Sequence, residues 1–308
     1  MRKKVISIFH FNRQVFAEYV ADNVLKYSAS LAYYTTLSIA PMLIIVIAVS
    51  GILFGRNAME GEVYNELQGL MGSQGAAHIQ DIIKNIHLNR ETPVATILSV
   101  VILLFGATGI FGEMQDSLNK IWGLKTTNYR IWWKILLDRL ISFSIIISLG
   151  FVMVVSLALN AVATALSNRI DIFFGAGGRI LAVTDMVVAT GITTLMFACI
   201  FKILPDAHIK WKDVMIGALI TAVLFMLGRF AIGLYLGQSN LASLFGAAGS
   251  LIVVMLWVYY SSATLYLGAV FTKVYAMNFG GKIRPNEYAT WIKVSEIPVA
   301  KATLHEVK

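Results

Sequence analysis

The sequence predicts an all-α membrane protein: a polytopic helical bundle of six transmembrane helices with interfacial amphipathic helices beside it. Hydrophobic residues make up 57% of the 308 residues and charged residues only 14%, and the mean hydropathy is +0.72. Soluble domains carry roughly 25% charged residues, so this composition cannot cover a water-exposed surface. Long apolar segments recur along the chain, and most cations lie in alternate connections between them.

Each predicted span is long enough to cross the hydrocarbon core of a bilayer, which takes about 20 helical residues. A spanning segment must be helical because its backbone polar groups find no water within the lipid. The six segments cover about residues 31–55, 93–112, 136–163, 181–204, 213–236 and 247–276. We expect them to form one membrane domain, 1–280, followed by a flexible cytoplasmic tail, 281–308.

The distribution of cations predicts the orientation. Nineteen of the 25 Lys and Arg residues lie in the N-terminal segment, in or beside the second and fourth connections, and in the last turn of the sixth span or after it. Five lie in the other connections. Cytoplasmic loops of membrane proteins carry an excess of Lys and Arg, so both termini are expected in the cytoplasm. The net charge of +8 therefore indicates topology and contact with membrane lipids, and we expect no nucleic-acid partner.

Two segments outside the spans have an amphipathic pattern. Residues 5–27 place apolar side chains close to the helical period, which predicts an interfacial helix on the cytoplasmic side. The connection 56–92 is the largest outside loop and contains two short amphipathic helical patterns. These helices either cap the bundle or form a gate or partner surface, and the sequence leaves both interpretations open.

Arg229 is the most informative single residue because it is a cation within the fifth span. A charge at membrane depth costs about 2.5–3.5 kcal/mol on insertion scales unless it is paired or hydrated. Arg229 either attracts an anion, such as a lipid phosphate, or serves as a structural ion pair or snorkelling side chain. Asp185, in the fourth span, is the nearest membrane-embedded carboxylate in the sequence, and whether the two meet is open.

The first span begins with an unusual run of hydroxyl side chains and contains a proline. Hydroxyls line a hydrated path or hydrogen-bond between helices, and Pro41 frees a backbone carbonyl and favours a kink. A broken helix beside a cavity and ordinary helix packing are both compatible with this run. The candidate pathway residues are Arg229, Asp185, Tyr33, Tyr34, Thr36, Ser38, Pro41 and Tyr235.

A second group of candidates lies at the cytoplasmic ends of the spans. Glu113 and Asp116 lie one helical turn apart, and they either bind a cation or proton or pair with Lys120 or Arg139. Lys202 and Trp211 flank the fourth connection. Close helix packing is expected at Gly106, Gly228, Gly233, Gly246 and Gly249. The single cysteine and the scattered histidines lack metal-ligand spacing, so we expect no metal site and no cofactor.

Several motifs are similar to those of one membrane-protein family. They are Ala29 to Pro41 (ASLAYYTTLSIAP), Asp116 to Trp122 (DSLNKIW), Lys202 to Pro205 (KILP), and Trp211 to Asp213 (WKD). In order and spacing the chain resembles the YihY / virulence factor BrkB family over about residues 10–280. The family often has a tyrosine before the glycine that corresponds to Gly246, where this chain has Phe245. The family also often has an acidic residue after the Gly-Ala pair that corresponds to Gly268 and Ala269, where this chain has Val270. Roles that rest on the tyrosine or on the acidic side chain therefore do not carry over.

The resemblance implies a bacterial inner-membrane protein of six spans, linked to virulence or serum resistance and to envelope lipid transport. We therefore expect transport or flippase-like handling of an envelope lipid or amphiphilic anion. The alternative is a non-transporting scaffold with envelope protein partners, and Gly233 with Gly237 is compatible with a homo-oligomer. The family also carries an old ribonuclease label. The cytoplasmic acids are too sparse for a metal-dependent nuclease, so we expect no enzyme activity.

Overall fold

The computed structural model describes residues 2–38, 109–126, 177–238, 247–287 and 289–292, together with the single positions 61, 64, 65, 68, 76 and 80. Four labelled helices dominate this part of the chain: α1 (Arg2–Ala21), α6 (Gly177–Ile203), α7 (Trp211–Gln238) and α9 (Ala247–Asn278). Residues 24–38 and 109–121 are helical as well. The six single positions, all within the 56–92 loop, are also helical.

Three of the helices are apolar and long enough to cross a membrane: Met186–Ile203 of α6, Trp211–Ile232 of α7 and Ile252–Asn278 of α9. They confirm the fourth, fifth and sixth predicted spans as apolar helices of spanning length. Residues 31–38 of the first predicted span and 109–112 of the second are helical. The rest of those two spans, with Pro41 and Gly106, and the whole third span lie outside the described residues, as does Gly246.

α7 and α9 pack as antiparallel neighbours through a reciprocal pair of glycines and threonines. A Cβ added to Gly217 would lie 1.9 Å from Thr272 Oγ1, and one added to Gly268 would lie 1.9 Å from Thr221 Oγ1. Each threonine hydroxyl donates 2.7 Å to the carbonyl of the glycine one turn earlier on its own helix. The hydroxyls are thereby satisfied without water, and the two backbones approach closely.

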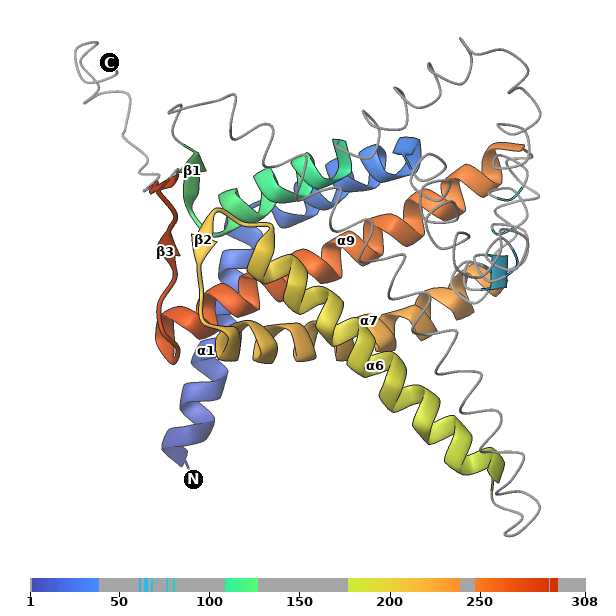
Figure 1. Cartoon of the computed structure of the whole chain (residues 1–308), viewed down its shortest axis with the longest axis horizontal. Coiled ribbons are helices and arrows are strands. Elements are labelled where there is room, and N and C mark those ends of the chain that lie inside the picture. Colours follow the sequence, from blue (N-terminus) through green and yellow to red (C-terminus); the bar gives the residue numbers. More distant parts are fainter. Residues whose placement is uncertain are drawn as a thin grey trace.

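The N-terminal helix differs from the predicted interfacial helix 5–27, because the structure divides that segment. α1 ends at Ala21, and Asn23 adopts a left-handed conformation with φ 52° before the next helix begins at residue 24. Asparagine tolerates this conformation better than most residues, so it suits the turn. α1 packs on the end of α9, where Phe11 meets Phe271 at 5.1 Å between ring centroids. Figure 1 shows α1 lying across one end of the bundle.

Four short strands lie at the same end, which we call the strand end. β1 (Leu124–Thr126) pairs antiparallel with β4 (Ala289–Trp291), and β2 (Ala207–His208) pairs antiparallel with β3 (Arg284–Pro285). Figure 1 shows β1, β2 and β3 beyond the helix ends. Within the tail that the sequence predicts to be flexible, residues 284–285 and 289–291 form strands. They pair with strands about 77 and about 165 residues earlier in the chain, and no local pattern encodes that pairing.

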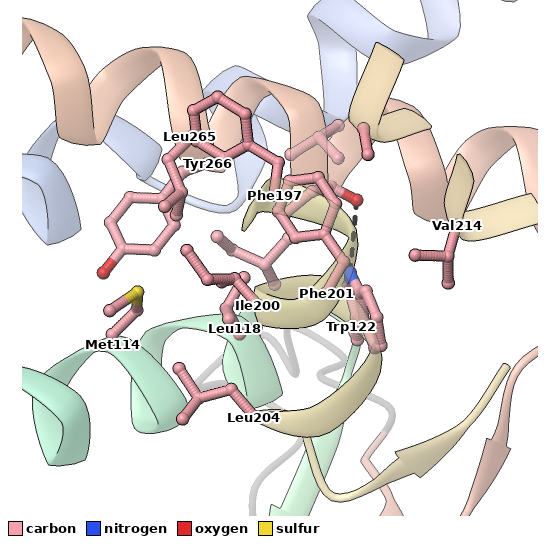
Figure 2. Close-up of a cluster of buried hydrophobic side chains, with 14 of the residues drawn as sticks. Met114, Leu118, Trp122, Phe197, Ile200, Phe201, Leu204, Val214, Leu265 and Tyr266 are labelled. Carbon is pink, nitrogen blue, oxygen red and sulfur yellow. Dashed lines mark hydrogen bonds between the residues drawn. The ribbon is translucent and has the colours of Figure 1, made fainter. Parts of the chain in front are cut away.

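The core near the strand end is built from large side chains of several helices. Trp122, Leu118, Phe201 and Tyr266 are fully or almost fully buried. Figure 2 shows these side chains between helix 109–121, the end of α6 and α9. The Trp122 indole N–H donates to the Ala269 carbonyl of α9 at 3.1 Å, which satisfies the one polar atom of the ring.

Substitution Gly268→Ala should destabilise the bundle because the new methyl group collides with Thr221 in α7. We expect a loss of about 1–3 kcal/mol, the usual cost of overpacking a tight interface. Thermal unfolding of the purified protein in detergent measures it. Gly191→Ala on α6 is the matched control, since a Cβ there meets nothing within 4 Å. Equal melting temperatures for the two variants would contradict this account of the α7–α9 contact.

Candidate functional site

The carboxylate of Asp206 is the centre of a buried polar network at the strand end. Its oxygens accept hydrogen bonds from Asn119 Nδ2 at 2.9 Å, Thr126 Oγ1 at 3.1 Å and Gln115 Nε2 at 3.3 Å. The Asp206 backbone N–H donates to Asn119 Oδ1 at 2.9 Å, so Asp206 and Asn119 are joined by two bonds. The Asp206 carbonyl accepts from the Asn286 N–H at 3.0 Å. One residue thus connects helix 109–121, the α6–α7 connection and the C-terminal strands.

Local sequence explains how Asp206 reaches this position. Pro205 cannot continue a helix, and α6 ends at Ile203 just before it. Helix 109–121 is followed by a turn at Trp122 and Gly123, and the φ of 70° at Gly123 directs the chain into β1. The two turns bring the side chains of Asn119 and Thr126 to Asp206. The sequence motifs DSLNKIW and KILP therefore meet in the structure, and their contact was not predicted.

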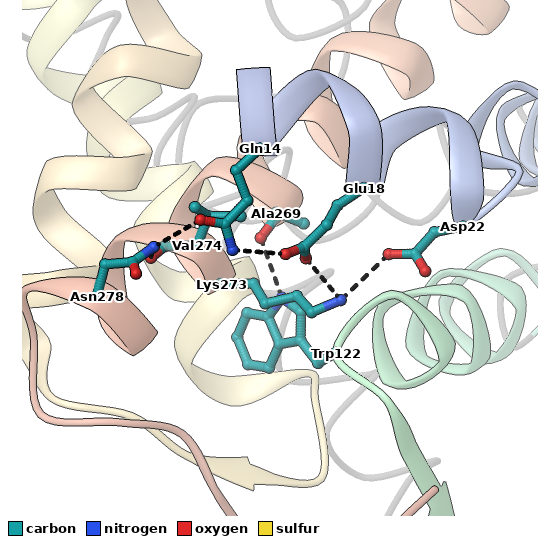
Figure 3. Close-up of polar contacts among 8 residues, drawn as sticks. All are labelled: Gln14, Glu18, Asp22, Trp122, Ala269, Lys273, Val274 and Asn278. Carbon is teal, nitrogen blue, oxygen red and sulfur yellow. Dashed lines mark hydrogen bonds and ion pairs between the residues drawn. The ribbon is translucent and has the colours of Figure 1, made fainter. Parts of the chain in front are cut away.

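A second polar network fastens α1 to α9. The Lys273 ammonium lies 2.9 Å from Glu18 Oε2 and 3.2 Å from Asp22 Oδ2. Gln14 Nε2 donates to Glu18 Oε1 at 3.0 Å, and Asn278 Nδ2 donates to Gln14 Oε1 at 3.0 Å (Figure 3). Partial burial raises the pKa of the Asp22 carboxyl above its usual value, and the Lys273 ammonium offsets part of this effect. The network fixes the N-terminal helix against the last span.

Two of the residues predicted to lie at the cytoplasmic face, Lys202 and Trp211, contact each other in the structure. Lys202 donates through Nζ to the Ile209 carbonyl, and its ammonium lies 5.8 Å from the centroid of the Trp211 ring. This is a cation–π contact between the ends of α6 and α7. Glu113 is half-buried and Asp116 exposed on helix 109–121. Lys120 lies over the ring of Tyr27 at 5.5 Å, and Arg139, the other predicted partner, lies outside the described residues.

The region around Arg229 is shaped by its neighbour Gly228. The ring of Tyr260 from α9 occupies the space where a Cβ of Gly228 would lie, and the Tyr260 hydroxyl donates to the Leu224 carbonyl at 3.1 Å. Gly228 thus lies where α7 and α9 pack closely. Arg229 itself is half-buried in the next position of α7. Gly233, Tyr235 and Gly249 have a helical backbone, and their packing lies outside what the structure describes.

α6 and α7 are in contact through their aromatic side chains. The rings of Phe197 and Phe225 meet at 5.7 Å between centroids. Figure 1 shows the two helices crossing and then diverging. The side chain of Asp185 lies outside the described residues, so its pairing with Arg229 stays a question raised by the sequence.

The hydroxyl run of the first span divides between exposed and internally satisfied side chains. Tyr33 and Tyr34 are exposed, with their rings in edge contact at 5.8 Å between centroids. Thr36 donates 2.7 Å to the Ala32 carbonyl of its own helix, and Ser38 is buried. Tyr34 also lies beside Gly109, so residues 24–38 run next to helix 109–121. The run thus presents aromatic hydroxyls outward.

Within the described ranges, no group of three or more His, Cys, Asp or Glu side chains is placed to hold a metal ion. The described residues contain buried polar groups that are hydrogen-bonded, cations near the span ends, and close contacts between helices. Together with the three apolar helices of spanning length, these features define a helical integral membrane protein.

Sequence comparison places the chain in a family. Residues 15–290 match the family model described as virulence factor BrkB, and the chain belongs to that family. It is 27% identical over 263 residues to a UPF0761 membrane protein of Psychromonas ingrahamii, covering 82% of each chain. It is 23% identical over 286 residues to the UPF0761 membrane protein MS0032 of Mannheimia succiniciproducens, covering 89% of this chain and 92% of the relative.

A further relative carries a different name. The putative ribonuclease-like protein YfkH of Bacillus subtilis is 22% identical over 265 residues, covering 84% of this chain and 92% of the relative. No solved structure matches the chain. The family resemblance stated from the motifs is thereby confirmed.

Substitution Asn119→Ala should destabilise the protein because it removes both hydrogen bonds with Asp206 and leaves a buried N–H without its acceptor. An unsatisfied buried polar group costs about 1–3 kcal/mol. The melting temperature in detergent reports the loss. Asn12→Ala, at an exposed position of α1, is the control that removes the same side chain. Melting temperatures of both asparagine variants equal to that of the wild-type protein would contradict this interpretation.

Proposed function

We propose that the protein is a bacterial inner-membrane transport or flippase-like protein for an envelope lipid or an amphiphilic anion, with both termini in the cytoplasm. The observation that carries this proposal is Arg229, a half-buried cation within an apolar helix of spanning length. Retaining a charge at such a position costs free energy unless it has a partner or a task. A guanidinium suits a phosphate because its donors match two oxygens at once.

The position of Arg229 along α7 indicates which part of the membrane it serves. It lies eighteen residues beyond Trp211, about 27 Å along the helix axis. A hydrocarbon core is about 30 Å thick, so Arg229 lies near the boundary opposite the strand end. We infer that it attracts the head of an amphiphile at the outer leaflet. This level is shallower than the deep site that the sequence suggested.

The strand end supports the proposed orientation. Exposed cations gather there on several segments: Lys125 in β1, Lys210 and Lys212 at the start of α7, and Lys282 and Arg284 after α9. Cytoplasmic loops carry such an excess, so we infer that this end faces the cytoplasm.

Substitution Arg229→Ala should reduce lipid movement at least about tenfold, because a charge-assisted hydrogen bond contributes about 1.5–3 kcal/mol. The measurement follows fluorescent phosphatidylglycerol across the bilayer of proteoliposomes with a membrane-impermeant quencher. Arg229→Lys keeps the charge and should retain part of the rate. Arg13→Ala, an exposed cation of α1, is the matched control and should leave the rate unchanged. Identical rates for wild type and a folded Arg229→Ala protein would remove Arg229 from the mechanism.

The alternative function is a non-transporting scaffold that uses the outside loop or the C-terminal tail. Transport is favoured because Arg284–Pro285 and Ala289–Trp291 of that tail pair with β2 and β1 of the same chain, which occupies backbone groups that a partner strand would need. Pull-down from native membranes separates the two functions. A stoichiometric protein partner, with no lipid movement in proteoliposomes, would favour the scaffold.

We also propose that the chain is not a nuclease, in contrast to the name of its Bacillus subtilis relative. Hydrolytic nucleases use clustered carboxylates or histidines to bind metal and activate water. The purified protein should therefore cleave a labelled RNA no faster than a mock preparation, with Mg²⁺ or Mn²⁺ present. Cleavage that co-purifies with the folded protein and responds to substitution of its acids would overturn this proposal.

A further inference from the structure

We propose that the strand end carries a docking surface for anionic phospholipid headgroups, formed by Lys210, Lys212, Lys282 and Arg284 with the aromatic rings of Trp211 and Phe279. We call these six residues the headgroup surface. This role of the headgroup surface requires only that α7 and α9 span the membrane. It does not depend on transport or on Arg229.

The fold gathers the headgroup surface from two segments that are 70 residues apart in sequence. β2 pairs with β3 so that His208 lies opposite Arg284. A Cβ on Gly281 would lie 2.4 Å from Lys210 Cδ, so the Lys210 side chain crosses the turn that follows α9. Lys282 has a φ of 59°, a left-handed conformation that a non-glycine residue seldom adopts. The chain therefore turns sharply at Lys282, beside Lys210.

Asp213 fixes this turn. Its Oδ2 accepts a hydrogen bond from the Gly281 N–H at 2.8 Å, and its carboxylate lies where a Cβ of Gly280 would be. Asp213 is buried and belongs to the first turn of α7, where a negative charge is stabilised by the helix dipole. Its carboxylate therefore holds the two segments together and does not present an anion to the outside.

The four cations are exposed, and within the described part of the chain no ion pair involves them. Glu287, an exposed acidic residue, lies between β3 and β4. The surface thus carries an excess of positive charge that is held in place by backbone pairing. Its complement is a partner with several closely spaced negative charges.

The position of the headgroup surface relative to the membrane indicates which partner binds it. The apolar span of α7 begins at Trp211 and that of α9 ends at Asn278, so the cations directly flank two span ends. Residues at this level meet lipid headgroups, toward which Lys and Arg side chains extend. Trp211 is 51% exposed and Phe279 is 60% exposed, as expected for rings that enter the interface. An acidic cytosolic protein or RNA would meet a surface farther from the spans.

The first test uses the unmodified full-length protein in lipid nanodiscs. Lysine acetylation is followed by mass spectrometry in discs of phosphatidylcholine alone and in discs that also contain phosphatidylglycerol. Each cation near an anionic membrane surface contributes roughly fivefold to binding. We expect phosphatidylglycerol to slow modification of Lys210, Lys212 and Lys282 at least about threefold more than that of Lys26 and Lys125. Equal slowing at all five lysines, or none, would overturn the proposal.

The second test compares two variants that lose the same charge. The surface variant carries Lys210→Gln, Lys212→Gln, Lys282→Gln and Arg284→Gln. The control carries Arg13→Gln, Lys26→Gln, Lys120→Gln and Lys125→Gln, all at exposed positions. Native mass spectrometry counts retained phosphatidylglycerol relative to phosphatidylcholine. We expect at least about a tenfold loss in the surface variant and less than about threefold in the control.

Equal losses in the two variants would mean that net charge alone attracts the lipid, which contradicts a built surface. Undiminished lipid retention together with RNA or acidic-protein binding that the surface variant loses would assign the surface to another partner. If the surface variant does not fold, the acetylation experiment on the wild-type protein decides alone.

Discussion

The buried carboxylate of Asp206 sets the strongest constraint on this fold. A carboxylate removed from water needs hydrogen-bond donors, and the side chains of Gln115, Asn119 and Thr126 supply them. These donors come from helix 109–121 and β1. The Asp206 N–H donates to Asn119, and the Asp206 carbonyl accepts from Asn286 after β3. Asp206 therefore joins the segment that follows the second predicted span, the α6–α7 connection and the C-terminal segment.

Packing inside the membrane obeys a different rule. Lipid chains are as apolar as the side chains, so burial of apolar area alone does not bring helices together there. The reciprocal contacts of Gly217 with Thr272 and of Gly268 with Thr221 replace that driving force with close van der Waals contact. The Trp122–Ala269 hydrogen bond joins the strand-end core to the same helix, so α9 connects both regions.

The two ends of the bundle have different electrostatic roles. At the strand end, buried acids are satisfied by hydrogen bonds while cations remain exposed beside the span ends. Lys273 is the exception, since it lies between Glu18 and Asp22 and attaches α1. Toward the other boundary, Arg229 is a cation within an apolar helix. Each of the two functional proposals places the phosphate of an amphiphile against positive charge, one at each of these levels.

The sequence by itself determined the membrane class, three spanning helices, the family, and the residue types at the candidate positions, because hydropathy and motif order are local properties. Only tertiary structure decided that Asp206 joins Asn119 and that Arg284–Pro285 and Ala289–Trp291 form strands. Each depends on register between segments many residues apart, which is fixed by side-chain fit and donor geometry and leaves no periodic signal in the chain.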